Sequence, residues 1–147
     1  MRTGLPLLDT LGRAAARILP GPLSPPLQAA HQELRRSLHL AFSLATAHGR
    51  AVCVAPAPEA GRGHLSLRLP EGVRWGRPAS IPLPPALLDT GWRTGRLRPL
   101  TLLPHRRAAA NVWFLHHGRE ALCLRLGLVG QVEILRYRPQ LGAWTRA

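Results

Sequence analysis

The arginines of this sequence are the residues whose type and spacing most directly suggest chemistry. A guanidinium group binds a phosphate through two parallel hydrogen bonds and stacks on bases, so clustered arginines favour nucleic-acid binding. One cluster follows Trp92 directly and contains no acidic residue; its members are Arg93, Arg96, Arg98, Arg106 and Arg107. A second group interleaves with Tyr137 and Trp144 near the C-terminal end; its members are Arg136, Arg138 and Arg146. The competing interpretation is that both groups are solvated strand and turn residues of an arginine-rich chain.

The overall charge agrees with a polyanionic partner but does not identify one. The chain has 147 residues, of which 20 are basic and 7 acidic, and all of the basic residues are arginine. Its formal net charge of +13 favours association with nucleic acid, an acidic membrane surface or an acidic protein. The length and the hydrophobic content of 46% predict one folded domain rather than a disordered chain. No apolar run is long enough for a transmembrane bundle.

Other residue types offer little catalytic or metal-binding chemistry. His116 and His117 are adjacent, and neighbouring side chains of a strand point to opposite faces, so they are not expected to chelate one ion. The acidic residues are scattered, and no nucleophile–base order or phosphate-binding loop is present. We therefore expect no enzyme, metal site, cofactor or small-molecule substrate. Cys53 and Cys123 are expected to be buried free thiols; the alternative is a disulfide, if the domain is exported and their strands are neighbours.

The elements that would position these residues begin with a long helix. Ser24 is a suitable N-cap, Pro25 fits the first helical position and Gly49 fits the position after the last turn. Apolar residues recur between them at spacings of three and four, which predicts an amphipathic helix with one buried face. They are Leu27, Leu34, Leu38, Ala41, Phe42 and Ala45.

After this helix the apolar residues alternate, which is typical of β-strands with one buried face. Strands are expected at residues 50–55, 64–69, 97–103, 111–117, 120–128 and 131–138, and an irregular loop at the proline-rich stretch 76–91. Tight turns at Gly118 and Val129-Gly130 predict an antiparallel meander. The even-numbered leucines from 122 to 128 should line one face of their strand. Core or edge packing is expected for Trp75, Trp113 and Trp144.

This order of elements resembles the plan of type IV pilin-like proteins, most specifically the minor pseudopilins of the GspH/FimT family. The helix-to-strand junction carries the resemblance, through LRRSLHLAFSLA at residues 34–45 and HGRAVCV at 48–54. The last strands of the family are similar to residues 121–135. The resemblance covers residues 27–138. It implies an α+β fold in which a long N-terminal amphipathic helix packs on an antiparallel β-sheet domain, with residues 24–147 as that domain.

Residues 1–23 form a separate amphipathic segment that resembles a divergent pilin-precursor leader. Such leaders are short and basic and end in Gly, followed by an apolar residue and by a Glu at the fifth position. Here Gly4, Leu5 and Asp9 occupy those places. The resemblance implies processing between Gly4 and Leu5, and a carboxylate at Asp9 that seeks the free amine of a neighbouring subunit.

Two departures from the family pattern narrow what the resemblance implies. Arg13, Arg17 and the run Pro20-Gly21-Pro22 interrupt the apolar stretch that anchors family helices in the inner membrane. The FimT branch captures DNA during natural transformation through a segment resembling Gly-Arg-x-Arg, where this chain has Gly-Gln-Val-Glu at 130–133. The nearby candidates to replace that segment are Arg136, Arg138 and Arg146.

The resemblance implies a non-enzymatic minor pseudopilin-like subunit of a bacterial type II secretion or type IV pilus system. Its partners would be other pilin or pseudopilin subunits, with DNA as a further ligand, and its location would be the cell envelope. Peripheral membrane association is compatible with the amphipathic segment. The alternatives are an arginine-rich nucleic-acid-binding module unrelated to pili, and a cytoplasmic domain in which residues 1–23 are a docking helix.

Overall fold

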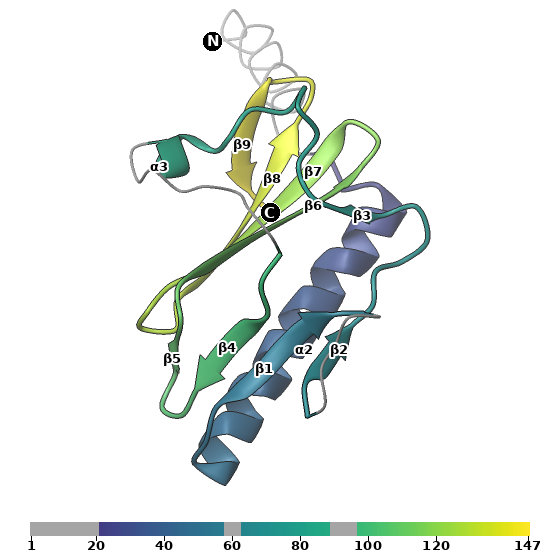
Figure 1. Ribbon diagram of the computed structural model, residues 1–147. Helices are drawn as coiled ribbons and strands as arrows, with labels where there is room; N and C mark the ends of the chain where they lie inside the picture. Colours follow the sequence, from purple (N-terminus) through teal and green to yellow (C-terminus); the bar gives the residue numbers. More distant parts are fainter. Residues whose placement is uncertain (1–20, 58–62, 89–96) are drawn as a thin grey trace, which may run out of the picture.

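The helix α2 (Pro25–His48) lies against strands of two β-sheets (Figure 1). The computed structural model describes residues 21–57, 63–88 and 97–147. Within them the small sheet has the strand order β2-β1-β4-β5 and the large sheet has the order β3-β6-β7-β8-β9. The strands are β1 (Val52–Pro56), β2 (Leu65–Leu67), β3 (Arg74–Trp75), β4 (Leu100–Leu103), β5 (Arg107–Ala108), β6 (Asn111–His117), β7 (Glu120–Leu126), β8 (Val132–Arg138) and β9 (Ala143–Arg146). The expected α+β class is confirmed.

The helix begins and ends where the sequence predicts. Pro25 stands at its first turn, and Gly49 ends it in the left-handed conformation, with φ of 63°. Its buried residues recur at spacings of three and four and are Leu27, Ala30, Leu34, Leu38, Ala41 and Ala45. Ser24 flanks the helix but makes no side-chain capping bond. Its hydroxyl instead lies 3.3 Å from Nδ1 of His117, so a tertiary contact replaces the expected local one.

The two sheets differ in strand direction. All pairs of the large sheet are antiparallel, as expected for the meander. In the small sheet β1 runs parallel to β2, with Val54 opposite Leu65, and antiparallel to β4. The prediction of an antiparallel β domain is therefore wrong for the pair β1–β2. Alternating apolar residues identify the buried face of a strand but carry no information about its direction.

Short elements occur where the sequence predicted none. The proline-rich stretch contains the four-residue helix α3 (Pro85–Leu88). β3 and β5 have two residues each, which is too short for a periodic signal. The strand expected at 120–128 ends at Leu126, because Gly127 begins the turn to β8.

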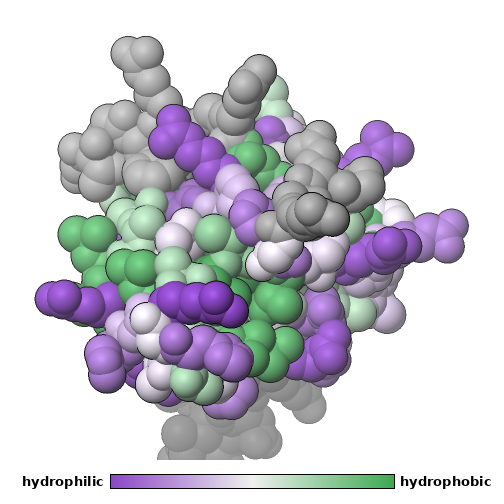
Figure 2. Space-filling view, turned by 60° about the horizontal axis from the view of Figure 1, so that its bottom comes forward, coloured by the Kyte–Doolittle hydropathy of each residue, from purple (hydrophilic) through white to green (hydrophobic). Residues whose placement is uncertain are grey.

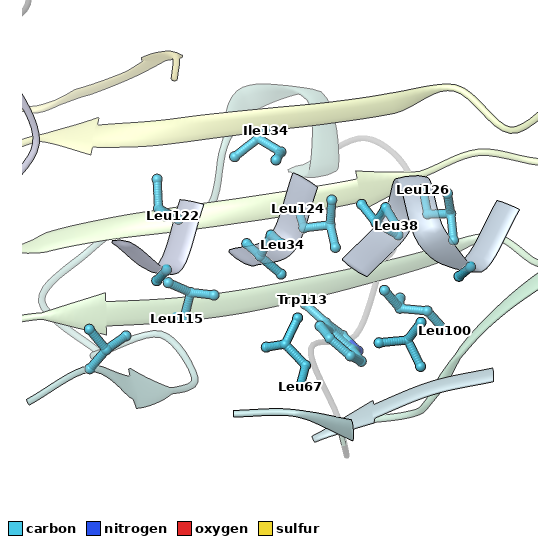
Figure 3. Close-up of a cluster of buried hydrophobic side chains, with 14 of the residues drawn as sticks. Leu34, Leu38, Leu67, Leu100, Trp113, Leu115, Leu122, Leu124, Leu126 and Ile134 are labelled. Carbon is cyan, nitrogen blue, oxygen red and sulfur yellow. The ribbon is translucent and has the colours of Figure 1, made fainter. Parts of the chain in front are cut away.

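The main core fills the space between α2 and the two sheets (Figure 3). Leu34 and Leu38 of the helix project into it. From the sheets it includes Leu67, Leu100, Leu115, Leu122, Leu124 and Ile134. Trp113 is fully buried, its ring meets that of Trp75 edge to face at 5.1 Å between centroids, and its Nε1 donates to the carbonyl of Arg98 at 2.6 Å. Trp113 packs in the core and Trp75 packs against it from the edge strand β3, in agreement with the prediction of core or edge packing.

A second, smaller cluster lies on the opposite face of the large sheet. Phe114 and Cys123 are buried there with Leu87 of α3, and Trp144 packs at its edge. Nε1 of Trp144 donates to the carbonyl of Pro82 at 2.8 Å, which ties the proline-rich segment to β9. In none of the described ranges does a helix combine the length and apolar character needed to cross a bilayer.

Candidate functional site

The turn between β4 and β5 brings two of the predicted arginines to the surface. Arg106 lies in this turn and Arg107 follows it at the start of β5, and both residues are exposed. His105 and Arg106 have positive φ values of 61° and 57°, a conformation that costs about 1–2 kcal/mol per residue in L-amino acids other than glycine. Neither arginine forms an ion pair with the described part of the chain.

Contacts from two other elements hold this strained turn in place. The backbone N–H of His105 lies 3.4 Å from Oγ1 of Thr46, near the C-terminal end of α2. On the other side, Gly130 in the β7–β8 turn approaches the carbonyl of Arg106 so closely that a side chain has no room. The backbone N–H of Ala108 donates to the carbonyl of Leu128 at 3.3 Å. The two turns therefore form one surface at this end of the molecule.

The β7–β8 turn contributes exposed aliphatic side chains to that surface. Leu128 is 68% exposed and Val129 is 72% exposed. The sequence predicted that Leu128 would lie with the other even-numbered leucines on one face of β7. This is wrong, because the strand ends at Leu126 and Leu128 lies in the turn. We call Arg106, Arg107, Leu128 and Val129 the turn patch. Figure 2, which brings the lower end of Figure 1 forward, shows hydrophobic residues at the surface beside strongly hydrophilic ones.

The other arginines of the first predicted cluster do not join the turn patch in the described structure. Arg98 is exposed but precedes β4, whereas Arg106 follows it, so the two lie at opposite ends of that strand. The carbonyl of Arg98 accepts hydrogen bonds from Trp113 and from the side chain of Asn111. Arg93 and Arg96 lie outside the described residues.

The structure does not bring the three C-terminal arginines into one patch. Arg136 and Arg138 are 8% and 5% exposed and lie on the face of β8 that also carries Ile134, which packs in the main core. Arg146 is exposed and pairs with Leu135, so it lies on the opposite face of the large sheet. Arg136 and Arg138 are not placed to contact an external phosphate together with Arg146.

Arg136 instead holds the chain that leads into α2. One of its terminal nitrogens donates to the carbonyl of Gly21 at 2.5 Å, and the other lies 3.9 Å from the Glu120 carboxylate. The same carboxylate lies 3.4 Å from the backbone nitrogen of Ser24. Burial lowers the pKa of Arg136, the nearby charge of Arg138 lowers it further and Glu120 raises it. Glu120 and Arg136 therefore form a polar cluster that fixes where the helix begins.

The cysteine and histidine side chains are further candidates for reactive or metal-binding groups. Cys53 on β1 and Cys123 on β7 are free, and their strands belong to different sheets. The expectation of a buried thiol is wrong for Cys53, which is only partly buried. Burial raises the pKa of the Cys123 thiol to about 12. His116 contacts the carbonyl of Gly76 and His117 contacts Ser24, so the adjacent rings point to different partners. Among the described residues, no three His, Cys, Asp or Glu side chains are grouped so that they could hold a metal ion.

The residues of the predicted processing site, Gly4, Leu5 and Asp9, lie outside the described residues. Comparisons of the chain with models of protein families, with curated proteins and with solved structures found no match.

Proposed function

We propose that this chain is a non-enzymatic, minor pseudopilin-like assembly subunit of a type II secretion or type IV pilus system. The observation that carries the proposal is the one-sided packing of α2. One face of the helix is buried against both sheets, while the opposite face is exposed along the length of the helix. The exposed residues include Gln28, Gln32, Arg35, Arg36, His39 and Ser43. In an assembly, this open face would pack against helices of neighbouring subunits.

The side chains on and beside the open face of α2 suit a reversible contact with another protein. Arg36 pairs with Glu33 at 2.8 Å, and Nε of Arg35 donates to Nε2 of His31 at 2.9 Å. Leu40 is 48% exposed between these polar groups and His39 and Ser43. Such a mixture is compatible with an interface between proteins that are also stable apart, because the composition of these interfaces is close to that of the remaining surface.

The two ends of α2 are held by different parts of the molecule. At the N-terminal end, Arg136 binds the carbonyl of Gly21, and Leu23 is buried in the core. At the C-terminal end, Thr46 contacts the β4–β5 turn of the turn patch. After processing between Gly4 and Leu5, the new N-terminal segment would lead into the end of α2 that lies away from the turn patch.

The experiment is to determine the native N-terminus and to cross-link the helix face in cells. Mass spectrometry of the protein recovered from its own bacterium should find a peptide that begins at Leu5. In a Cys53→Ser background, a cysteine placed by Gln32→Cys or Ser43→Cys should form cross-links to pilin-like subunits. Ser66→Cys, exposed on β2, is the matched control and should form none. An uncleaved N-terminus together with equal cross-linking at all three positions would refute the proposal.

A nucleic-acid-binding module is the second candidate function, favoured by the exposure of Arg98, Arg106 and Arg107. It predicts DNA binding without sequence preference that weakens with salt, because each neutralised phosphate adds roughly 0.7–0.9 to the log–log slope. The double substitution Arg106→Ala and Arg107→Ala should reduce both affinity and slope. Arg119→Ala, in the exposed β6–β7 turn, is the control. An unchanged gel shift at low salt would remove this candidate.

A further inference from the structure

The tip of the β7–β8 turn is the most exposed aliphatic feature of the described structure. Leu128 and Val129 are adjacent and exceed the exposed fraction of the other large hydrophobic residues, such as Leu40 at 48% and Leu141 at 42%. They project from a turn, so the apolar surface is convex. A convex apolar tip can enter a partner that deforms around it, and such a partner needs no preformed pocket.

Most of the backbone N–H groups of this tip, and two of its carbonyls, are already hydrogen-bonded within the protein. Gly127 N–H donates to the carbonyl of Gln131 at 2.9 Å, Gly130 N–H donates to Gly127 at 3.0 Å, and Val129 N–H donates to Oε1 of Gln131 at 3.1 Å. The carbonyl of Leu128 accepts from Ala108. Internally bonded amides and carbonyls lose little when water is removed, which suits a surface that enters an apolar medium.

The charges beside the tip are positive. Arg106 and Arg107 are exposed and form no ion pair with the described part of the chain. The nearest acidic residue along β8, Glu133, is paired with Arg125 at 2.9 Å. Aliphatic side chains flanked by arginines complement a surface that offers both hydrocarbon and negative phosphate.

We propose that the turn patch docks on an anionic phospholipid surface. Leu128 and Val129 enter the boundary between headgroups and acyl chains, while Arg106 and Arg107 bind lipid phosphates. Nucleic acid offers phosphates but no apolar phase for the two aliphatic side chains, so the patch fits lipid better. Docking at this end leaves the open face of α2 free. The inference therefore does not depend on the proposed assembly function.

The experiment measures co-sedimentation of the purified full chain with vesicles. Vesicles of phosphatidylglycerol and phosphatidylcholine in equal amounts should bind the protein, and vesicles of phosphatidylcholine alone should bind it much less. Replacing both Arg106 and Arg107 by Ala should weaken binding about twenty-five-fold, since each arginine near an anionic surface contributes about fivefold. Replacing both Leu128 and Val129 by Ser should weaken it by more than about tenfold, because inserted CH₂ groups are lost.

Matched controls separate the patch from general charge and hydrophobicity. Leu141→Ser removes an exposed aliphatic residue from the β8–β9 turn, and Arg119→Ala removes an exposed arginine from the β6–β7 turn. Both should bind vesicles as the unchanged chain does. The proposal is overturned if anionic vesicles do not bind, or if the serine variant binds them unchanged. It is also overturned if the chain binds DNA through Arg106 and Arg107 but does not sediment with vesicles.

Discussion

Gly130 lies directly against the carbonyl group of Arg106: a Cβ atom built on Gly130 would be 2.0 Å from that carbonyl oxygen. The two residues belong to turns of different sheets, β7–β8 and β4–β5. Their contact joins the sheets at the end of the molecule where Thr46 of α2 also meets the β4–β5 turn. The exposed arginines therefore stand on a turn that is fixed from both sides, although its backbone is strained.

This contact predicts that Gly130→Ala destabilises the protein more than another glycine substitution with similar backbone strain. Gly142 provides the comparison, since its φ of +59° resembles the +73° of Gly130, but a Cβ there would meet only Oη of Tyr137, at 3.9 Å. We expect Gly142→Ala to cost about 1–2 kcal/mol, and Gly130→Ala to cost about 1–3 kcal/mol more because of overpacking. Urea unfolding measures both. Equal costs would mean that the turns separate easily.

Substitutions of Trp113 should lower the free energy of unfolding by disturbing the main core. Trp113→Ala removes a fully buried ring and its edge-to-face contact with Trp75, and should lower the free energy of unfolding by about 3–5 kcal/mol. Trp113→Phe keeps an aromatic ring but loses the donor to the Arg98 carbonyl, which still accepts from Asn111, so a smaller loss of about 1–2 kcal/mol is expected. Chemical denaturation of both variants tests the order; an equal loss would contradict it.

The sequence predicted best those features that depend on local backbone rules. Pro25 and Gly49 mark the ends of α2, because proline is accommodated in the first turn of a helix and glycine readily adopts a positive φ. The turn at Gly118 and the strands β6 to β8 follow from alternation and glycine placement. The direction of β2 and the two-residue strands β3 and β5 depend on pairing with distant segments, which alternation does not encode.

The candidate sites were harder to predict because arginines look alike in a sequence. Arg106 and Arg136 both lie in basic, aromatic-containing stretches, yet one is exposed on a turn and the other is buried against Gly21. Both partners of Arg136 are distant from it in the sequence, since Gly21 precedes α2 and Glu120 lies on the neighbouring strand β7. The exposure of Leu128 followed from the early end of β7, a shift of two residues that changes a buried side chain into an exposed one.

The two thiols should differ in reactivity. Cys123 is buried and its pKa is raised to about 12, so almost none of it is thiolate near neutral pH. Cys53 is partly exposed on β1. Iodoacetamide should therefore modify Cys53 in the native protein and both residues after unfolding, as measured by peptide mass spectrometry. A Cys53→Ser variant should remain unmodified while folded; rapid native labelling of Cys123 would show that its cluster opens readily.

His31 predicts a dependence of stability on pH. Burial lowers the pKa of His31 below its ordinary value of 6.5, and the charge of Arg35, whose Nε donates to the ring, lowers it further. At pH values between the pKa of His31 in the folded chain and its higher pKa in the unfolded chain, the unfolded chain binds more protons. The stability contributed by neutral His31 is therefore complete above pH 6.5 and is lost as the pH falls below that value. Urea unfolding across this range should show a weaker pH dependence for His31→Gln than for the unchanged chain. Parallel curves for His31→Gln and the unchanged chain would contradict the role of His31.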